Sequence, residues 1–288
     1  MKRVLITGIT SLHGWPLYNA LTARLGARQV LGLCPPKTPP GRFPAANVLP
    51  CCMNDVPGLS AAFARFRPTH VIHAAGMCDL DVCELWPGLA YQRNVEGARN
   101  VAQLSRDCYV LYCSTDLVFS GNAPPLTGYH ETSPPDPLSM IGKTFLQAEA
   151  LMAGLPEALI LRKGLPMGAS FSGRKGPLDY LAHRLRQGKP LTLFYDEWRS
   201  ALYLDDFITG VCLLWEQERQ GLYHFGGPQH VSLYDIGRYL VTTRAYDPAC
   251  LLRASRFEDH AGLPRIGNVA LDSQRAYAVM GFTPRAWP

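Results

Sequence analysis

The 288-residue sequence lacks the features that mark a membrane, secreted or repeat protein. The apolar stretch in MKRVLITGIT breaks at Gly8, which favours a first strand over a signal peptide or a membrane span. No repeat or low-complexity segment occurs. Charged residues make up 18%, and the net charge of +5 is spread along the chain, which indicates mild affinity for anions such as phosphates. We expect a cytoplasmic protein that contacts neither nucleic acid nor membrane.

Metal-binding patterns are also absent. Nine cysteines are present, an odd number, without Cys-x-x-Cys or His spacing that would hold a metal. Most lie in apolar, strand-like surroundings, so we predict reduced core thiols and no metal site. Cys78 and Cys83 fall in a predicted loop, and pairing or metal ligation by these two stays open as the alternative.

What is present is a regular alternation of short β-branched runs with longer amphipathic runs in the first half. KRVLITG, RQVLGLC, HVIHAAG and YVLYCSTDLVF are the predicted strands, with amphipathic stretches between them. This order predicts an α/β fold, a Rossmann-like doubly wound parallel sheet. We expect a dinucleotide-binding domain over residues 1–160. Residues 161–288 are predicted to form mainly a smaller C-terminal substrate lobe, interleaved with the last sheet strands.

The stretch VLITGITSLHG has the form of a phosphate-binding turn between a strand and a helix. Gly8 permits the tight turn, and Gly14 permits close packing of helix on strand. The position between them, usually Gly so that the backbone can approach a pyrophosphate, is Ser11, whose Cβ crowds that approach while its hydroxyl offers a hydrogen bond. An ordinary turn that has lost its ligand is the alternative interpretation.

The second predicted strand ends in Cys34, with no acidic residue to hold a ribose 2′-hydroxyl. Lys37 and Arg42 follow in a Pro-rich loop and are suited to a 2′-phosphate instead. The pattern therefore favours NADP slightly over NAD as the cofactor.

Seven stretches, in order along almost the whole chain, together resemble the extended short-chain dehydrogenase/reductase family, and within it the dTDP-4-dehydrorhamnose reductase type. They are VLITGITSLHG, RPTHVIHAAGMCDLDVCE, YQRNVEGARNVAQL, LYCSTDLVFSG, YHETSPPDPLSMIGKTFLQAE, LILRKGLPMG and LYLDDF. The resemblance implies that Ala74, Ala75 and Gly76 border the cofactor and that Asn94 steadies the site. It also matches Thr115 to the catalytic Ser/Thr that orients a substrate carbonyl; a Thr that caps the next turn is the alternative.

The family's proton donor is the Tyr of a Tyr-Gly-x-Ser/Thr-Lys run, and here the sequence departs from the pattern. An ungapped alignment matches Gly142, Thr144 and Glu149 and places Ile141 on the Tyr and Phe145 on the Lys. A rival register pairs Ser139 with Lys143 at the right spacing but loses the three matches.

The two replacements bear directly on the chemistry. Hydride transfer to a ketone builds an alkoxide that must be protonated, and the family uses a phenol whose pKa a nearby ammonium lowers. Neither Ile141 nor Phe145 can donate a proton, and losing positioned acid catalysis costs roughly 10²–10⁴ in rate. The segment therefore predicts that the standard chemistry has been abandoned.

Other residues are candidates for a replacement proton donor or for ligand contacts. Asp116, His130 and Tyr129 lie near the expected substrate position and are candidates for a replacement acid, although turn and loop roles are the simpler interpretation. Arg199 is a candidate for a phosphate or carboxylate, with a surface salt bridge as the alternative. Further candidates of lower rank are Trp198 for stacking on a base and Lys163, Arg174 and Lys175 for phosphate.

Three functions remain open from the sequence. The first is an atypical reductase of a nucleotide sugar or similar polar ketone; the second is a non-catalytic protein that binds a nucleotide or a protein partner on the same fold; the third is a non-redox enzyme, for which no convincing nucleophile is present. A homodimer is also open, because the family often pairs helices across a two-fold axis. Fold alone cannot choose between them.

Overall fold

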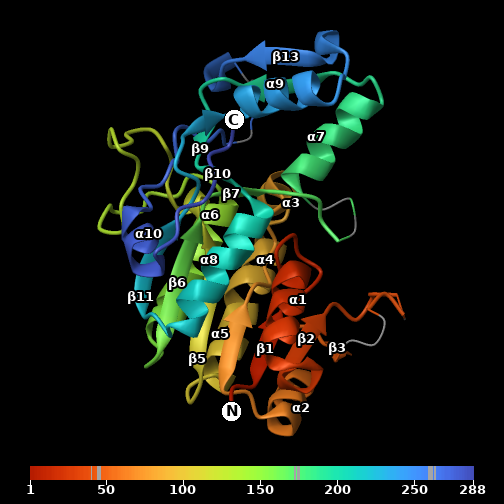
Figure 1. Cartoon of the computed structure of the whole chain (residues 1–288), viewed down its shortest axis with the longest axis vertical. Coiled ribbons are helices and arrows are strands. Elements are labelled where there is room, and N and C mark those ends of the chain that lie inside the picture. Colours follow the sequence, from red (N-terminus) through yellow and green to blue (C-terminus); the bar gives the residue numbers. More distant parts are fainter. Residues whose placement is uncertain (40, 44–46, 172, 174–175, 259–261, 263) are drawn as a thin grey trace.

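Figure 1 shows the computed structural model of the chain, which describes every residue except 40, 44–46, 172, 174–175, 259–261 and 263. Two predicted phosphate candidates, Arg174 and Lys175, lie outside the described residues. Among the described residues, no helix combines the length and the apolar character needed to cross a membrane.

The core of the molecule is a seven-stranded parallel sheet in the order β11-β6-β5-β4-β1-β2-β3. Its inner strands are almost fully buried, as their continuous apolar runs predict, whereas the two edge strands are partly exposed. They span Val4–Thr7 (β1), Val30–Cys34 (β2), Val48–Pro50 (β3), His70–His73 (β4), Tyr109–Thr115 (β5), Ala158–Lys163 (β6) and Gly221–Phe225 (β11). The strand order reverses between β1 and β4, the point at which open α/β sheets bind ligands at their carboxyl edge. The predicted fold class is confirmed.

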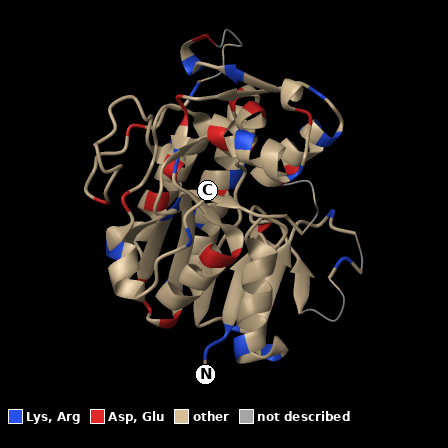
Figure 2. Cartoon of the chain, turned by 45° about the horizontal axis from the view of Figure 1, so that its top comes forward, with Lys and Arg blue, Asp and Glu red and all other residues tan. Residues whose placement is uncertain are grey.

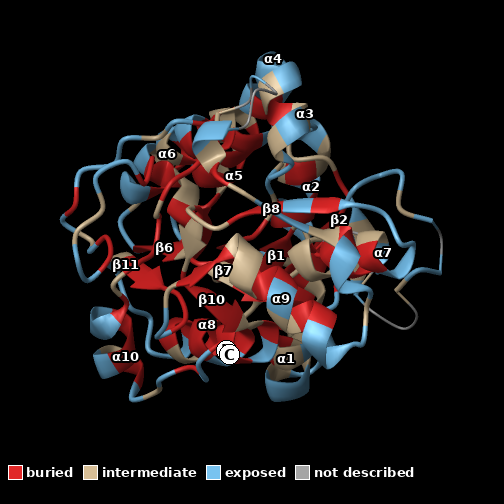
Figure 3. Cartoon of the chain, turned by 90° about the horizontal axis from the view of Figure 1, so that it is seen from above, coloured by how far each residue is buried: buried red, intermediate tan, exposed pale blue. Residues whose placement is uncertain are grey.

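Two layers of helices cover the sheet. The first face packs against α1 (Gly14–Leu25), α8 (Leu204–Glu216) and α10 (Gln274–Met280). The second packs against α2 (Val56–Phe66), α5 (Gly97–Leu104) and α6 (Met140–Ala153). Figure 3 shows the buried residues concentrated in the sheet between these layers. Because side chains alternate along a strand, each strand supplies both cores.

Two short helices and an irregular turn lie beside α6. They are α3 (Leu80–Leu85), α4 (Pro87–Tyr91) and a π-helical turn, Gln92–Glu96, that continues directly into α5. Such single π turns inside helices are often found at functional sites, and this one carries Asn94.

A smaller lobe stands above the carboxyl edge of the sheet (Figure 1). It contains α7 (Pro177–Arg186), α9 (Leu233–Thr243) and a separate apolar core. Three two-stranded sheets complete it: β7 (Leu165–Met167) with β10 (Ala201–Tyr203), β9 (Trp198–Arg199) with β12 (Val231–Ser232), and β8 (Leu191–Phe194) with β13 (Leu251–Ala254). The predicted boundary at residue 160 falls inside β6, and β11 returns from the lobe segment to the sheet, so the chain passes between the two parts more than once. Figure 2 shows Lys and Arg interspersed with Asp and Glu along the chain.

Candidate functional site

The glycine turn after β1 has the geometry that a close backbone approach requires. Gly8 has φ of 68°, and a Cβ there would lie 2.5 Å from the Ala75 Cα. At Gly14 a Cβ would lie 2.3 Å from the Gly8 carbonyl oxygen. Both positions therefore need glycine, one for the turn and one for packing α1 against it.

Ser11, between the two glycines, folds back on the helix. Its backbone N–H donates to the Gly8 carbonyl at 2.9 Å, and its Oγ accepts from the Gly14 N–H at 3.0 Å. The first N–H groups of a helix are the ones that would hold a phosphate. The Ser11 hydroxyl thus occupies one of these donors while keeping its own proton available.

His13, which sequence reasoning did not single out, is buried at the start of α1. Its ring meets Phe207 edge to face at 5.6 Å between centroids, and its Nε2 has no hydrogen-bond partner. Burial, with a contribution from the Lys163 ammonium, lowers the pKa of His13 to about 3. The imidazole is therefore neutral and adds no charge to the phosphate turn; its position in the turn was its only signal in the sequence.

The predicted cofactor-bordering residues lie together at the end of β4. Ala74 is buried, and the Ala75 N–H donates to the Thr7 Oγ1 at 3.2 Å. Gly76 is exposed, and a Cβ there would lie 2.8 Å from the Phe145 Cζ. Ala74 and Ala75 therefore face the glycine turn, whereas Gly76 faces α6.

Asn94 ties three segments together. Its Oδ1 accepts from the Met77 N–H at 2.7 Å, and its Nδ2 donates to the Met77 carbonyl at 3.1 Å and to the Thr144 Oγ1 at 2.9 Å. The side chain is buried and its hydrogen bonds go to protein atoms. In this arrangement Asn94 fixes the loop after β4 against α6.

The two replaced positions on α6 are part of the core. Ile141 is 1% exposed and Phe145 is 3% exposed. The Phe145 ring lies 6.2 Å from the Tyr112 ring and against Gly76. An apolar ring therefore fills the place where the ungapped alignment puts an ammonium.

The rival register does not bring its two residues to one site. The Ser139 Oγ accepts from the Gly142 N–H at 3.2 Å and caps α6, whereas Lys143 is exposed. The ungapped frame keeps Glu149 in a buried contact with Arg162, where the Arg162 Nη2 donates to Oε2 at 2.7 Å. The geometry favours the ungapped frame.

Thr115, at the end of β5, caps the turn that follows. Its Oγ1 accepts from the Leu117 N–H at 3.3 Å and donates to the Asp116 Oδ1 at 3.2 Å. Its side chain is 3% exposed. These contacts correspond to the capping alternative, while its place at the carboxyl edge of the sheet is the one that the family resemblance implies.

Asp116 and Arg199, both predicted as ligand contacts, bind each other. The Arg199 Nε donates to Oδ2 at 2.7 Å and Nη2 donates to Oδ1 at 2.6 Å. Asp116 is fully buried and the Arg199 side chain is 14% exposed. The pair joins the sheet to β9 of the lobe, and neither charge is left uncompensated for a ligand.

Lys163 is a charged side chain at the carboxyl edge of the sheet that forms no ion pair with another described residue. It ends β6, level with Thr115 on β5, and lies on the α1 side of the sheet because Leu161 does. Its ammonium acts electrostatically on Cys78 and Cys113 as well as on His13. Cys78 has exposed surface, and desolvation nevertheless raises the pKa of its thiol.

The loop after β2 packs on α1 and on the lobe. Arg42 donates to the Phe171 carbonyl at 3.3 Å and lies 4.7 Å over that ring. Trp15 contacts Phe43 and Phe171, at 4.6 and 5.0 Å between centroids. Lys37 is exposed. Of the two cations suggested for a 2′-phosphate, Arg42 is engaged with protein and Lys37 is available.

The remaining acid candidates lie apart. Tyr129 is 5% exposed and stacks on Phe119 at 4.0 Å, whereas His130 is exposed. The nine cysteines are all free, and no group of metal-ligating side chains forms within the described part of the chain. Cys83 lies buried on α3 and not in the loop where it was predicted. That prediction was wrong because the segment from Leu80 forms a helix, capped by Asp79.

The two ends of the candidate cofactor site differ in the groups that they offer to a dinucleotide. The turn of Gly8 and Gly14 keeps the tight backbone geometry of a phosphate-binding turn, since a Cβ at either position would clash with the surrounding backbone. The end near Gly76 lacks the ammonium that anchors a nicotinamide ribose in the family, because Phe145 fills its place.

Comparisons with known proteins agree with this architecture. The family described as RmlD substrate binding domain matches residues 1–288. Methionine adenosyltransferase 2 subunit beta of Xenopus laevis is 29% identical over 307 aligned positions, which cover 100% of this chain and 88% of that protein. A dTDP-4-dehydrorhamnose reductase of Aggregatibacter actinomycetemcomitans is 28% identical, covering 77% of this chain and 79% of that protein.

A solved structure shares the fold. The dTDP-4-dehydrorhamnose reductase of Bacillus anthracis, in complex with NADP, superposes with a TM-score of 0.81 at 22% identity and covers 100% of this chain and 96% of that chain. The family match over the full length, the ordered motifs and the sheet topology lead to one conclusion: the chain belongs to the RmlD substrate binding domain family, within the dTDP-4-dehydrorhamnose reductase type of short-chain dehydrogenases/reductases.

Proposed function

We propose that this protein binds a nicotinamide dinucleotide and a nucleotide sugar or similar polar molecule without carrying out the Tyr/Lys reductase reaction. The observation that carries the proposal is the Phe145 ring, 3% exposed and packed against Gly76, together with the buried Ile141 one turn earlier. A buried apolar pair supplies neither the proton nor the charge that ketone reduction needs. Gly8 and Gly14 support binding of the pyrophosphate.

NADP is the cofactor that we favour. The loop after β2 has no acidic residue to bind a ribose 2′-hydroxyl, and Lys37 in that loop is exposed. The NADP in the Bacillus anthracis relative supports the same choice. We place the protein in the cytoplasm, in keeping with reduced cysteines such as Cys34 and Cys113.

Titration with NADPH and NADH tests binding, followed through reduced-cofactor fluorescence. We expect saturable binding, tighter for NADPH, and no oxidation of NADPH when a dTDP-4-keto-6-deoxy sugar is added. Robust turnover that Thr115→Ala abolishes would refute the proposed loss of chemistry. Absence of binding to either cofactor would refute the binding half.

A matched pair of variants tests the role of position 145. Phe145→Met and Phe145→Lys have similar length, so their difference isolates the ammonium. We expect Phe145→Lys to unfold at lower urea concentration than Phe145→Met, because a charge is forced into the core. Reductase activity in the double variant Ile141→Tyr/Phe145→Lys, and none in the wild type, would show that the site lacks only these two groups.

A second candidate function is regulation of a partner enzyme. It is favoured by the similarity to methionine adenosyltransferase 2 subunit beta over the full length of this chain. Co-purification of the tagged protein with a methionine adenosyltransferase catalytic subunit from the same cells, measured with and without NADPH, tests it. Recovery of the chain alone or as a homodimer in both conditions would count against this function.

A further inference from the structure

Lys163 brings a positive charge to the carboxyl edge of the sheet, where Phe145 fills the place of another. It is the last residue of β6, pairs in register with Thr115 of β5, and is partly buried. Gly164, directly after it, packs its backbone against Ser200, since a Cβ there would clash with the Ser200 carbonyl oxygen. The strand end that carries Lys163 is therefore fixed in place, and the cation belongs to β6 instead of α6.

The Lys163 ammonium acts on groups from three neighbouring segments. Burial lowers the pKa of His13 in the glycine turn, and Lys163 adds to that effect. Desolvation raises the pKa of Cys78, in the loop after β4, and of Cys113, on β5, and Lys163 opposes the rise at both. Because these groups belong to the β1 turn, the β4 loop and β5, the side chain extends along the carboxyl edge towards the reversal of strand order between β1 and β4.

The other charges at this position cancel each other. Besides desolvation, the charges that act on the Cys78 thiol are those of Lys163, Asp116 and Arg199. Asp116 and Arg199 form the bidentate pair, and the His13 imidazole is neutral because burial lowers its pKa to about 3. The electrostatic field in this part of the site is therefore positive, and it comes from Lys163.

The two halves of a dinucleotide lie over different halves of such a sheet. In open α/β folds the pyrophosphate binds where the strand order reverses, and the adenosine ribose binds beside the strand that follows the first helix. That strand is β2 here, so the nicotinamide half belongs over β4, β5 and β6, where Lys163 lies. The oxidised nicotinamide ring is a cation and the reduced ring is neutral. A fixed ammonium on this side therefore acts differently on the two redox states of the cofactor.

We propose that Lys163 makes the site selective for the reduced cofactor, NADPH, over NADP⁺. The inference rests on the proposed function, because it requires a nicotinamide dinucleotide to bind at the glycine turn. The ammonium repels the cationic ring of NADP⁺, whereas the neutral ring of NADPH meets no such repulsion. The Phe145 ring is 3% exposed and packed against Gly76, so it offers no open face to offset the repulsion through a cation–π contact. A protein that distinguishes the two forms without interconverting them responds to their ratio.

Calorimetric titration of the full chain with NADPH and with NADP⁺ measures the selectivity as the ratio of the two Kd values. We expect NADP⁺ to bind the wild type about tenfold more weakly than NADPH. The ratio should fall to about one in Lys163→Met and stay about tenfold in Lys163→Arg, which keeps the charge. Lys143→Met removes an exposed ammonium from α6 and is the matched control, with the ratio of the wild type. Lys163→Gln carries the test if circular dichroism shows that Lys163→Met does not fold.

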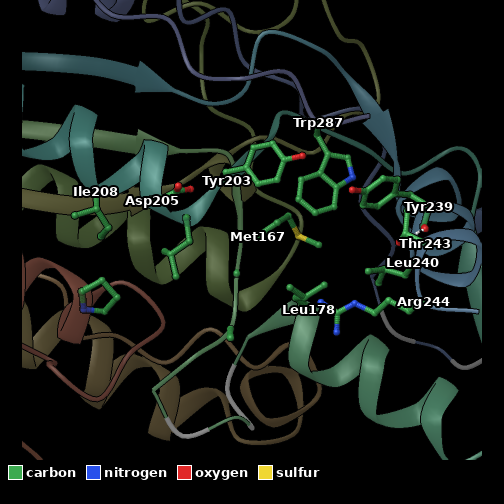
Figure 4. Close-up of a pocket in the computed structure, with 14 residues that line it drawn as sticks. Met167, Leu178, Tyr203, Asp205, Ile208, Tyr239, Leu240, Thr243, Arg244 and Trp287 are labelled. Atoms are coloured by element: carbon green, nitrogen blue, oxygen red, sulfur yellow. Dashed lines mark hydrogen bonds between the residues drawn. The ribbon is translucent and has the colours of Figure 1, made fainter.

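Two further comparisons decide where the effect arises. The nucleotide 2′,5′-ADP lacks the nicotinamide half, and we expect it to bind wild type and Lys163→Met equally. Figure 4 shows a separate cavity, with Met167, Tyr203 and Leu240 in its lining, and Lys163 does not line it. A dinucleotide held in that cavity would give the same ratio in wild type and Lys163→Met, which would contradict the inference.

The remaining outcomes separate this inference from the proposed function. A loss of affinity in Lys163→Met that is equal for NADPH and NADP⁺ would make Lys163 a phosphate contact and overturn the inference, with the proposed function intact. Equal Kd values for the two cofactors in the wild type would also overturn the inference alone. Binding of neither cofactor would overturn the proposed function, and this inference with it.

Discussion

Arg199 and Asp116 form a bidentate ion pair, with N–O distances of 2.6 and 2.7 Å, across the junction of the sheet and the lobe. The carboxylate is fully buried, so its hydrogen bonds to Arg199 and Thr115 replace those lost to water. The pair therefore holds the lobe in place over the carboxyl edge of the sheet.

Removing one partner of this ion pair should destabilise the fold. Arg199→Met leaves the Asp116 carboxylate buried without its cation, and we expect the free energy of unfolding to fall by about 3–5 kcal/mol. Urea denaturation followed by circular dichroism measures it. Adding Asp116→Asn to Arg199→Met should recover part of the loss, since the uncompensated charge is gone; a double variant that loses the sum of the two single losses would contradict this account.

Lys163 is expected to control the thiol of Cys78. Desolvation raises the pKa of Cys78, which still has exposed surface, and the Lys163 ammonium opposes that rise. Lys163→Met should therefore raise this pKa further and slow alkylation by iodoacetamide at pH 8, because less thiolate is present. Mass spectrometry of the labelled peptide gives the rate at each pH.

Two comparisons make the Lys163 prediction specific. Lys143→Met removes an exposed ammonium on α6 and should leave the Cys78 rate unchanged. Cys52, half-buried in the loop after β3, serves as the internal reference thiol. Equal Cys78 rates in wild type and Lys163→Met across the pH range would show that the ammonium does not face this thiol.

Three of the four histidines that are buried among the described residues should make the fold sensitive to acid. Burial lowers the pKa of His13 and His224 to about 3 and that of His73 to about 4. In the unfolded chain an imidazole titrates near 6.5, so between pH 6.5 and 4 the unfolded chain binds protons that the folded chain does not. The free energy of unfolding should therefore decrease as the pH is lowered through this window, by up to about 1.4 kcal/mol per pH unit for each histidine.

One carboxyl acts in the opposite direction. Burial raises the pKa of Glu197 to about 7, so the folded chain binds the extra proton between pH 4.5 and 7 and gains stability as the pH falls. A single group is outweighed by three. Urea denaturation from pH 7.5 to 4.5 should show a net loss, with a smaller slope in His73→Gln and an unchanged slope in His183→Gln, an exposed control. A flat profile would contradict the burial of the imidazoles.

The sequence predicted the parts of the fold that depend on local pattern. Apolar runs bounded by turns located β1, β2, β4 and β5, and Gly8 and Gly14 marked the turn because only glycine fits there. The ungapped motif also located Ile141 and Phe145 correctly on one buried face of α6.

Contacts between distant segments were beyond such reasoning. Asp116 and Arg199 were predicted as separate ligand contacts. They lie 83 positions apart in the sequence, and their pairing depends on how the lobe packs on the sheet. The burial of His13 depends on α8, and the packing of Arg42 on Phe171 depends on a loop that follows β7. Local patterns carry no signal for these relationships because each is set by tertiary packing.

Ser11 offers the most direct test of dinucleotide binding. Its Oγ accepts from the Gly14 N–H at 3.0 Å. In the proposed site a pyrophosphate would approach the backbone beside its Cβ. Ser11→Gly frees the donor and removes the Cβ, so we expect tighter NADPH binding by fluorescence titration, at a cost of about 0.3 kcal/mol in stability from the lost hydrogen bond to the Gly14 N–H. Ser11→Leu adds bulk and removes the hydroxyl, so it should weaken binding. Equal affinity in wild type, Ser11→Gly and Ser11→Leu would contradict binding of the NADPH pyrophosphate at this turn.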